Sequence, residues 1–120
     1  MKIVVVTLFP EFIGHAVGFG VLGRAIERGL LTVETVNPRD FATDVHRTVD
    51  DRPYGGGPGM VLKAEPLRLA MQQALRRVPA ALRICLAADG APVTQRKVEE
   101  LARRDELVLV AGRYEGVDER

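Results

Sequence analysis

Four apolar runs rich in β-branched residues constrain the fold of this chain more than any other feature. They span residues 3–8, 31–36, 83–88 and 107–111, and each ends at a Pro, Gly, Asn or Asp. Runs of this length and composition are typical of strands that are buried on both faces, as in a parallel sheet. The sequence therefore predicts four buried strands.

Amphipathic patterns between these runs predict helices. The expected helices cover residues 10–17, 21–29, 67–78 and a stretch that begins after Thr94, whose hydroxyl is expected to cap the first turn. Strands that alternate with crossovers of this length form parallel sheets, because right-handed crossovers lay helices over the apolar strands. We therefore expect an α/β fold with a mostly parallel sheet and helices on both faces.

Length and charge limit the function classes. A chain of 120 residues holds one domain, and a net charge of +1 gives no overall signal for nucleic acid, so any polyanion site is local. The single cysteine, Cys85, lies in an apolar run and is expected to be a buried strand residue, which fits a reducing cytoplasm. Pro10 ends the apolar N-terminal run before it reaches the length of a signal or membrane segment.

Two loops follow strands at the edge where open α/β sheets bind ligands. One loop covers residues 87–92 and the other covers residues 112–120. If the two strands are neighbours, both loops face one crevice, with Arg113, Tyr114 and Glu115 over it. This arrangement predicts a pocket for a flat, polar small molecule. A charged helix N-terminus at 112–120 is the alternative interpretation.

Residues 50–60 are too rich in glycine and proline for a helix or strand. Glycine allows close approach to a ligand, and proline prevents regular structure. Arg52 and Tyr54 add a charge and a stacking face. The segment is interpreted as a functional loop, with a plain flexible linker as the alternative.

Other familiar motifs lack their structural context. Residues 18–23 match G-x-G-x-x-G and Asp40 follows at a suitable distance, but a helix is expected between the first strand and this motif, so a nicotinamide site is rejected. No Lys-Ser/Thr follows the glycines of a possible phosphate loop. His15 and His46 lack partners at ligand spacing, so no metal site is predicted. His15 is expected at a helix surface, and His46 can assist an anion site.

Four strings occur in an order that resembles one enzyme family. Leu8–Glu11, Asn37–Phe41, Thr48–Met60 and Gly112–Arg120 together resemble the bacterial tRNA (guanine-N1)-methyltransferases, which are trefoil-knotted (SPOUT) methyltransferases. The resemblance runs along the whole chain. It implies a cytoplasmic homodimer that transfers the methyl group of S-adenosylmethionine to N1 of guanine at position 37 of tRNA, with no membrane or DNA partner.

The resemblance also implies roles for individual residues. The implied cofactor-binding residues are Leu86, Ala87, Ala88, Asp89, Gly90, Gly112, Arg113, Tyr114, Glu115 and Gly116. Glu115 is the candidate for catalytic support, near the methyl donor and the target base. The implied RNA-binding residues are His46, Arg47, Asp50, Arg52, Tyr54 and Gly59. Arg24 and Arg28 are either phosphate contacts or part of a solvated helix face.

Two departures from the family pattern stand out. Relatives commonly carry Ser-Pro-Gln-Gly where this chain has Ala87-Ala88-Asp89-Gly90, which changes the groups offered to the cofactor. The family continues past the position of Arg120 through the knot, a third cofactor loop, the aspartate thought to act as general base, and a helical tRNA-binding domain. We therefore expect residues 1–120 to be the N-terminal portion of the methyltransferase domain, with the knot incomplete, the C-terminal tRNA-binding domain absent, and no activity alone.

Two other functions remain open from the sequence. A non-catalytic RNA-binding module of the same fold would bind tRNA without depending on the cofactor, since a fold does not by itself imply its chemistry. A nucleotide-binding enzyme that uses the glycine segment on phosphate would lose nucleotide affinity when the glycines are replaced.

Overall fold

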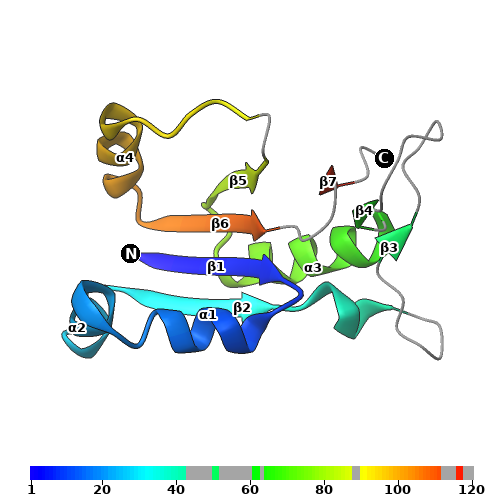
Figure 1. The fold of residues 1–120 in the computed structure, drawn as a ribbon, viewed down its shortest axis with the longest axis horizontal. Coiled ribbons are helices and arrows are strands. Elements are labelled where there is room, and N and C mark those ends of the chain that lie inside the picture. The colour runs from blue at the N-terminus through cyan, green and yellow to red at the C-terminus, as the bar shows by residue number, and fades with distance from the viewer. Residues whose placement is uncertain (43–49, 52–60, 63, 88–89, 112–115, 118–120) are drawn as a thin grey trace.

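A four-stranded parallel sheet forms the centre of the fold (Figure 1). The structure is a computed structural model, which describes residues 1–42, 50–51, 61–62, 64–87, 90–111 and 116–117. The strands lie in the order β2-β1-β6-β5, and every pairing is parallel. Their bounds are Lys2–Thr7 for β1, Thr32–Val36 for β2, Leu82–Leu86 for β5 and Glu106–Ala111 for β6. The four predicted strands and their parallel arrangement are confirmed.

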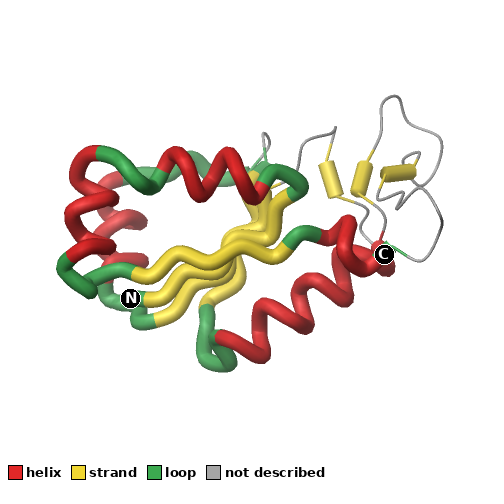
Figure 2. The backbone as a smooth tube through the Cα atoms, turned by 90° about the horizontal axis from the view of Figure 1, so that it is seen from below, coloured by secondary structure: helices red, strands yellow, loops and turns green. Residues whose placement is uncertain are grey.

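The predicted helices are also present. Their bounds are Pro10–Ala16 for α1, Gly20–Glu27 for α2, Ala64–Arg77 for α3 and Gln95–Ala102 for α4. Figure 2 shows α3 on one side of the sheet, whereas the other helices do not lie on that side. The expectation of helices on both faces is therefore confirmed. Within the described part of the chain, no helix has the length and apolar character needed to cross a membrane.

One short helix was not predicted. The 3-10 helix η1 (Pro38–Phe41) follows β2 directly and packs against α3. The Asn37 side chain accepts a hydrogen bond from the Arg39 backbone N–H at 3.0 Å, and Pro38 is buried. This bond between a side chain and the backbone two residues on turns the chain out of the strand.

The core lies between the sheet and α3. Side chains at alternate positions of β1 and β6 face this helix, and on the helix Ala70 and Ala74 are fully buried. Because alanine has no side chain beyond Cβ, the helix backbone packs close to the strands. The buried cluster consists of Val4, Val6, Leu8, Val36, Leu67, Ala70, Ala74, Val78, Val108 and Val110.

A shared ion pair lies at the surface beside this core. The Glu34 carboxylate on β2 is 3.2 Å from Lys2 Nζ on β1 and 3.2 Å from an Arg77 guanidinium nitrogen at the end of α3. All three side chains are about one-third exposed, so each contact contributes modestly to stability. The pairs nevertheless connect the end of α3 to the two strands that it covers.

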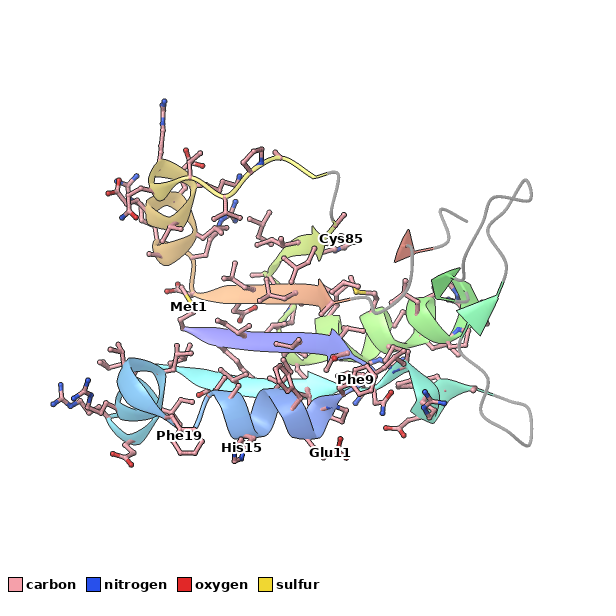
Figure 3. The ribbon with its side chains drawn as sticks, in the orientation of Figure 1. Met1, Phe9, Glu11, His15, Phe19 and Cys85 are labelled. Carbon is pink, nitrogen blue, oxygen red and sulfur yellow. The ribbon has the colours of Figure 1, made fainter. Side chains whose placement is uncertain are left out.

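The strand β5 differs from the expectation of burial on both faces. Arg83, Cys85 and Leu86 are exposed, and Leu86 retains 52% of its accessible surface. The reason is that β5 is an edge strand and α4, which connects it to β6, has no buried residue. The prediction of a buried Cys85 is therefore wrong, and Figure 3 shows this residue near the end of β5.

The glycines at 18–23 serve the turn between α1 and α2. Gly20 begins α2 with a φ of +62°, and Gly23 is buried where an added Cβ would lie 2.7 Å from the carbonyl oxygen of Gly18. Only glycine allows this approach of two backbones. The helix expected between the first strand and this motif is present as α1, so the motif does not follow a strand directly.

We expect replacement of Ala74 by leucine to destabilise the fold, because a larger side chain cannot fit between α3 and the sheet. Overpacking of this kind lowers the free energy of unfolding by about 1–3 kcal/mol. Gln72→Leu on the exposed side of α3 is the matched control, expected to change it by about 0.5 kcal/mol or less. Urea unfolding followed by circular dichroism measures both, and equal stability of the two variants would contradict this packing.

Candidate functional site

The carboxyl ends of β5 and β6 lie side by side. Leu86 pairs with Ala111, and each is the last residue of its strand. The two segments predicted to form a small-molecule pocket therefore leave adjacent points on one edge of the sheet. This adjacency is the condition on which the prediction depended.

A cavity of about 470 Å³ opens beside β5, between this strand, the connection that follows it and α4. Leu86, Ala87 and Gly90, three of the predicted cofactor-binding residues, line it. Thr94 and Lys97 from the start of α4 also contribute to the lining. The volume falls within the range of about 300–1,000 Å³ that is usual for small-molecule pockets.

The connection between β5 and α4 has two fixed points. The Gly90 N–H donates to the Ala87 carbonyl oxygen at 3.2 Å, and an added Cβ at Gly90 would lie 3.3 Å from the same oxygen. Farther on, the Thr94 hydroxyl accepts from the Lys97 N–H at 3.2 Å, which confirms the predicted cap of α4. A glycine at position 90 therefore keeps the turn at the mouth of the cavity tight.

A second, small sheet joins two site segments that are distant in sequence. It consists of β3 (Asp50–Asp51), β4 (Val61–Leu62) and β7 (Gly116–Val117), in the order β3-β4-β7. The strand β4 pairs antiparallel with β3 and parallel with β7. Figure 1 shows this sheet beyond the carboxyl ends of the main strands. Paired strands thus flank the glycine-rich segment in sequence, and β4, which follows it, pairs with the residues that follow Glu115.

These pairings bear on the alternatives left open by the sequence. The residues on either side of this segment pair in β3 and β4, whereas residues 52–60 lie outside the described residues, so the loop and linker interpretations both stay predictions. A helix start at 112–120 is wrong for Gly116 and Val117, because they form β7. Strands of two residues are too short to produce a hydrophobic period, so sequence patterns did not reveal them.

Several predicted site residues lie outside the described residues. These are His46, Arg47, Arg52, Tyr54, Gly59, Ala88, Asp89, Gly112, Arg113, Tyr114 and Glu115. The backbones of Asp50 and Gly116 are placed, in β3 and β7. The structure thus brings Leu86, Ala87 and Gly90 together around the cavity and joins Asp50 to Gly116 through β4.

Three residues on or directly after the first two helices lie away from these elements. His15 is exposed and meets Phe19 edge to face with ring centroids 5.1 Å apart, as Figure 3 shows. Arg24 on α2 and Arg28 directly after it are exposed, and α2 lies at the opposite end of the main sheet from β3, β4 and β7 (Figure 1). This position favours the interpretation of the two arginines as a solvated helix face.

Thr7 is a residue at this edge that the sequence analysis did not identify. It ends β1, is 5% exposed, and its hydroxyl accepts a hydrogen bond from the Phe9 N–H at 3.1 Å. The sequence signal was a hydroxyl residue at the end of a strand, because such a side chain can accept a hydrogen bond from the backbone N–H two residues later in the turn into a helix.

Comparisons with known proteins agree with this arrangement. The family model described as tRNA (Guanine-1)-methyltransferase TrmD matches residues 1–120. A tRNA (guanine-N(1)-)-methyltransferase of Alcanivorax borkumensis is 59% identical over 118 residues, covering 98% of this chain and 44% of that protein. The corresponding protein of a Marinomonas species is 54% identical over 120 residues, covering all of this chain and 48% of the relative.

A solved structure shares the fold. The tRNA (m1G37) methyltransferase from Aquifex aeolicus superposes with a TM-score of 0.89 at 35% identity, over all of this chain and 54% of that one. The chain thus spans about half the length of the relatives that it matches. Since the family model matches it from end to end, the chain belongs to the tRNA (guanine-1)-methyltransferase family.

Proposed function

We propose that this chain is the N-terminal portion of a methyltransferase domain that methylates N1 of guanine at position 37 of tRNA, with S-adenosylmethionine as methyl donor. The observation that carries this proposal is the pairing of β4 with β7. It connects the base of the glycine-rich segment to the segment that follows β6. A transferase that joins a nucleic-acid substrate to a small-molecule donor needs its two binding segments in contact, because positioning supplies much of the rate enhancement.

The residues around the cavity fit the proposed cofactor. Leu86 and Ala87 offer apolar side chains, Gly90 leaves the backbone open, and the volume suits a ligand of nucleoside size. These residues would hold the cofactor from the β5 side, and Gly112 to Gly116 would hold it from the β6 side. S-adenosylmethionine supplies a methyl group on a sulfonium, which is activated for displacement.

The remaining roles fall on the RNA and on its proton. Guanine N1 carries a proton that must leave as the methyl group arrives, so a carboxylate near this atom assists the transfer. Glu115 is proposed for this support. His46, Arg47, Asp50, Arg52, Tyr54 and Gly59 are proposed to contact the tRNA, where an aromatic ring and open glycine backbone suit an unstacked base.

The first test is methyl transfer from labelled S-adenosylmethionine to unmodified tRNA that carries guanine or adenine at position 37. The chain is assayed in parallel with a form extended by its native continuation to the length of its relatives. We expect transfer only to the guanine tRNA, and only by the extended form. Transfer to neither tRNA by either form, together with tRNA binding that ignores the cofactor, would instead support the non-catalytic RNA-binding module.

The role of Glu115 is tested by Glu115→Gln in the extended form. Loss of a general acid–base group lowers kcat by about 10²- to 10⁴-fold, and loss of a carboxylate that supports the proton transfer should lower kcat by up to this range, with little change in the KM for tRNA. Glu119→Gln, four residues on in the same acidic segment, is the matched control and should retain its kcat. Equal kcat values for the two variants would remove Glu115 from the chemistry.

The proposal includes a cytoplasmic homodimer. Large apolar side chains are exposed on and beside the first two helices, with Phe12 at 71% and Phe19 at 64% of their accessible surface. Exposed apolar surface of this kind favours association. We expect the extended form to show twice its chain mass by light scattering across micromolar concentrations. A mass of one chain over this whole range would contradict the dimer.

A further inference from the structure

Three residues form a row across the carboxyl end of the main sheet. Thr7 of β1 pairs with Ala111 of β6, and Ala111 pairs with Leu86 of β5. Residues in register on parallel strands point to the same face, and neighbouring strands lie about 4.8 Å apart. Leu86 lines the cavity beside β5, so Thr7 lies on the same face as this wall, two strands away.

Thr7 is the polar member of this row and is almost fully buried. Its accessible surface is 5% of the full value, and among the described residues no other polar or charged residue is buried to this degree. The hydroxyl oxygen accepts from the Phe9 N–H at 3.1 Å. A buried hydroxyl is costly to desolvate, and this hydrogen bond offsets the cost.

The hydrogen bond fixes the turn from β1 into α1. It orients the backbone N–H of Phe9, next to Pro10 at the start of the helix, and Figure 3 shows Phe9 in this turn. Leu8, which lies between Thr7 and Phe9, is buried in the core with 6% of its surface exposed. Thr7, the last residue of β1, is thereby fixed by its side-chain hydrogen bond, by its backbone pairing and by the burial of the next residue, Leu8.

The end of β1 in turn sets the end of β6. These strands pair from Lys2 with Glu106 through to Thr7 with Ala111, so a shift of the β1 end is transmitted to Ala111. Ala111 is the residue from which the predicted second cofactor segment departs, and it lies beside Leu86. We propose that Thr7 is a positioning residue for the cofactor cavity, acting through the row Thr7–Ala111–Leu86. This inference rests on the proposed function.

Asn37 provides the matched control. It makes the same kind of bond, from the backbone N–H two residues on, at the end of β2 and at a similar distance of 3.0 Å. Its strand pairs with β1 only, on the side away from the cavity. Loss of the Asn37 bond therefore disturbs an equivalent turn without reaching Ala111 or Leu86.

The test measures the Kd of S-adenosylmethionine by calorimetry on the extended form of the protein. A hydrogen bond of this kind corresponds to a change of about fivefold, so we expect Thr7→Val to raise the Kd by about this factor. Thr7→Ser keeps the hydroxyl and should remain within about twofold of the unsubstituted protein, as should Asn37→Ala. The KM for tRNA should change less than the Kd in Thr7→Val.

A measurement on the unsubstituted protein keeps the inference testable if Thr7→Val fails to fold. Coupling between a bond and a ligand is reciprocal, so the cofactor should slow amide exchange at Phe9 by the same factor and leave Arg39 unchanged. An unchanged Phe9 amide, equal Kd values for Thr7→Val and the unsubstituted protein, or an equal effect of Asn37→Ala would overturn the inference alone. Absence of cofactor binding by the unsubstituted protein would overturn the proposed function and this inference together.

Discussion

The pairing of β1 with β6 is the interaction on which the rest of the structure depends. These two central strands are in register over six residue pairs, and they present Val4, Val6, Val108 and Val110 to α3. Burial of these side chains against the small residues of α3 closes the core. The same register aligns the carboxyl ends of the strands, so the segments that follow them begin along one edge. The register of β1 with β6 thus determines both the packing of the core and the position of the candidate site.

Much of the architecture was predictable because it is encoded locally. Apolar runs predicted the four main strands. Thr94 marked the start of a helix because its side chain caps the first turn, and Gly29 marked the end of another because it adopts a positive φ. Burial was less predictable. Cys85 lies in an apolar run like those of the central strands, yet it is exposed because β5 is at the sheet edge. Strand order, which no local pattern records, determines how much of each strand is covered.

The candidate site likewise had parts that the sequence could predict and parts that it could not. That two segments would leave neighbouring strands followed from the alternation of strands and helices, and the register of Leu86 with Ala111 confirms it. The pairing of β4 with β7 could not be predicted, because each strand has two residues and their partners are more than fifty positions apart in sequence. Such short contacts depend on the main sheet to bring them together. The resemblance of short strings to a known family predicts that these segments belong to one site.

The two sheets differ in the length of their ladders, and this difference suits the proposed reaction. The main sheet contributes long ladders with a buried face, so it provides a rigid frame for the proposed cofactor site. In the small sheet each ladder holds two residue pairs, so opening it breaks few hydrogen bonds. Segments with few bonds and little buried surface open at low free-energy cost. In the proposed enzyme, which admits a folded RNA beside a small donor, this division would let the proposed RNA side adjust while the row from Thr7 to Leu86 keeps the proposed donor side in place.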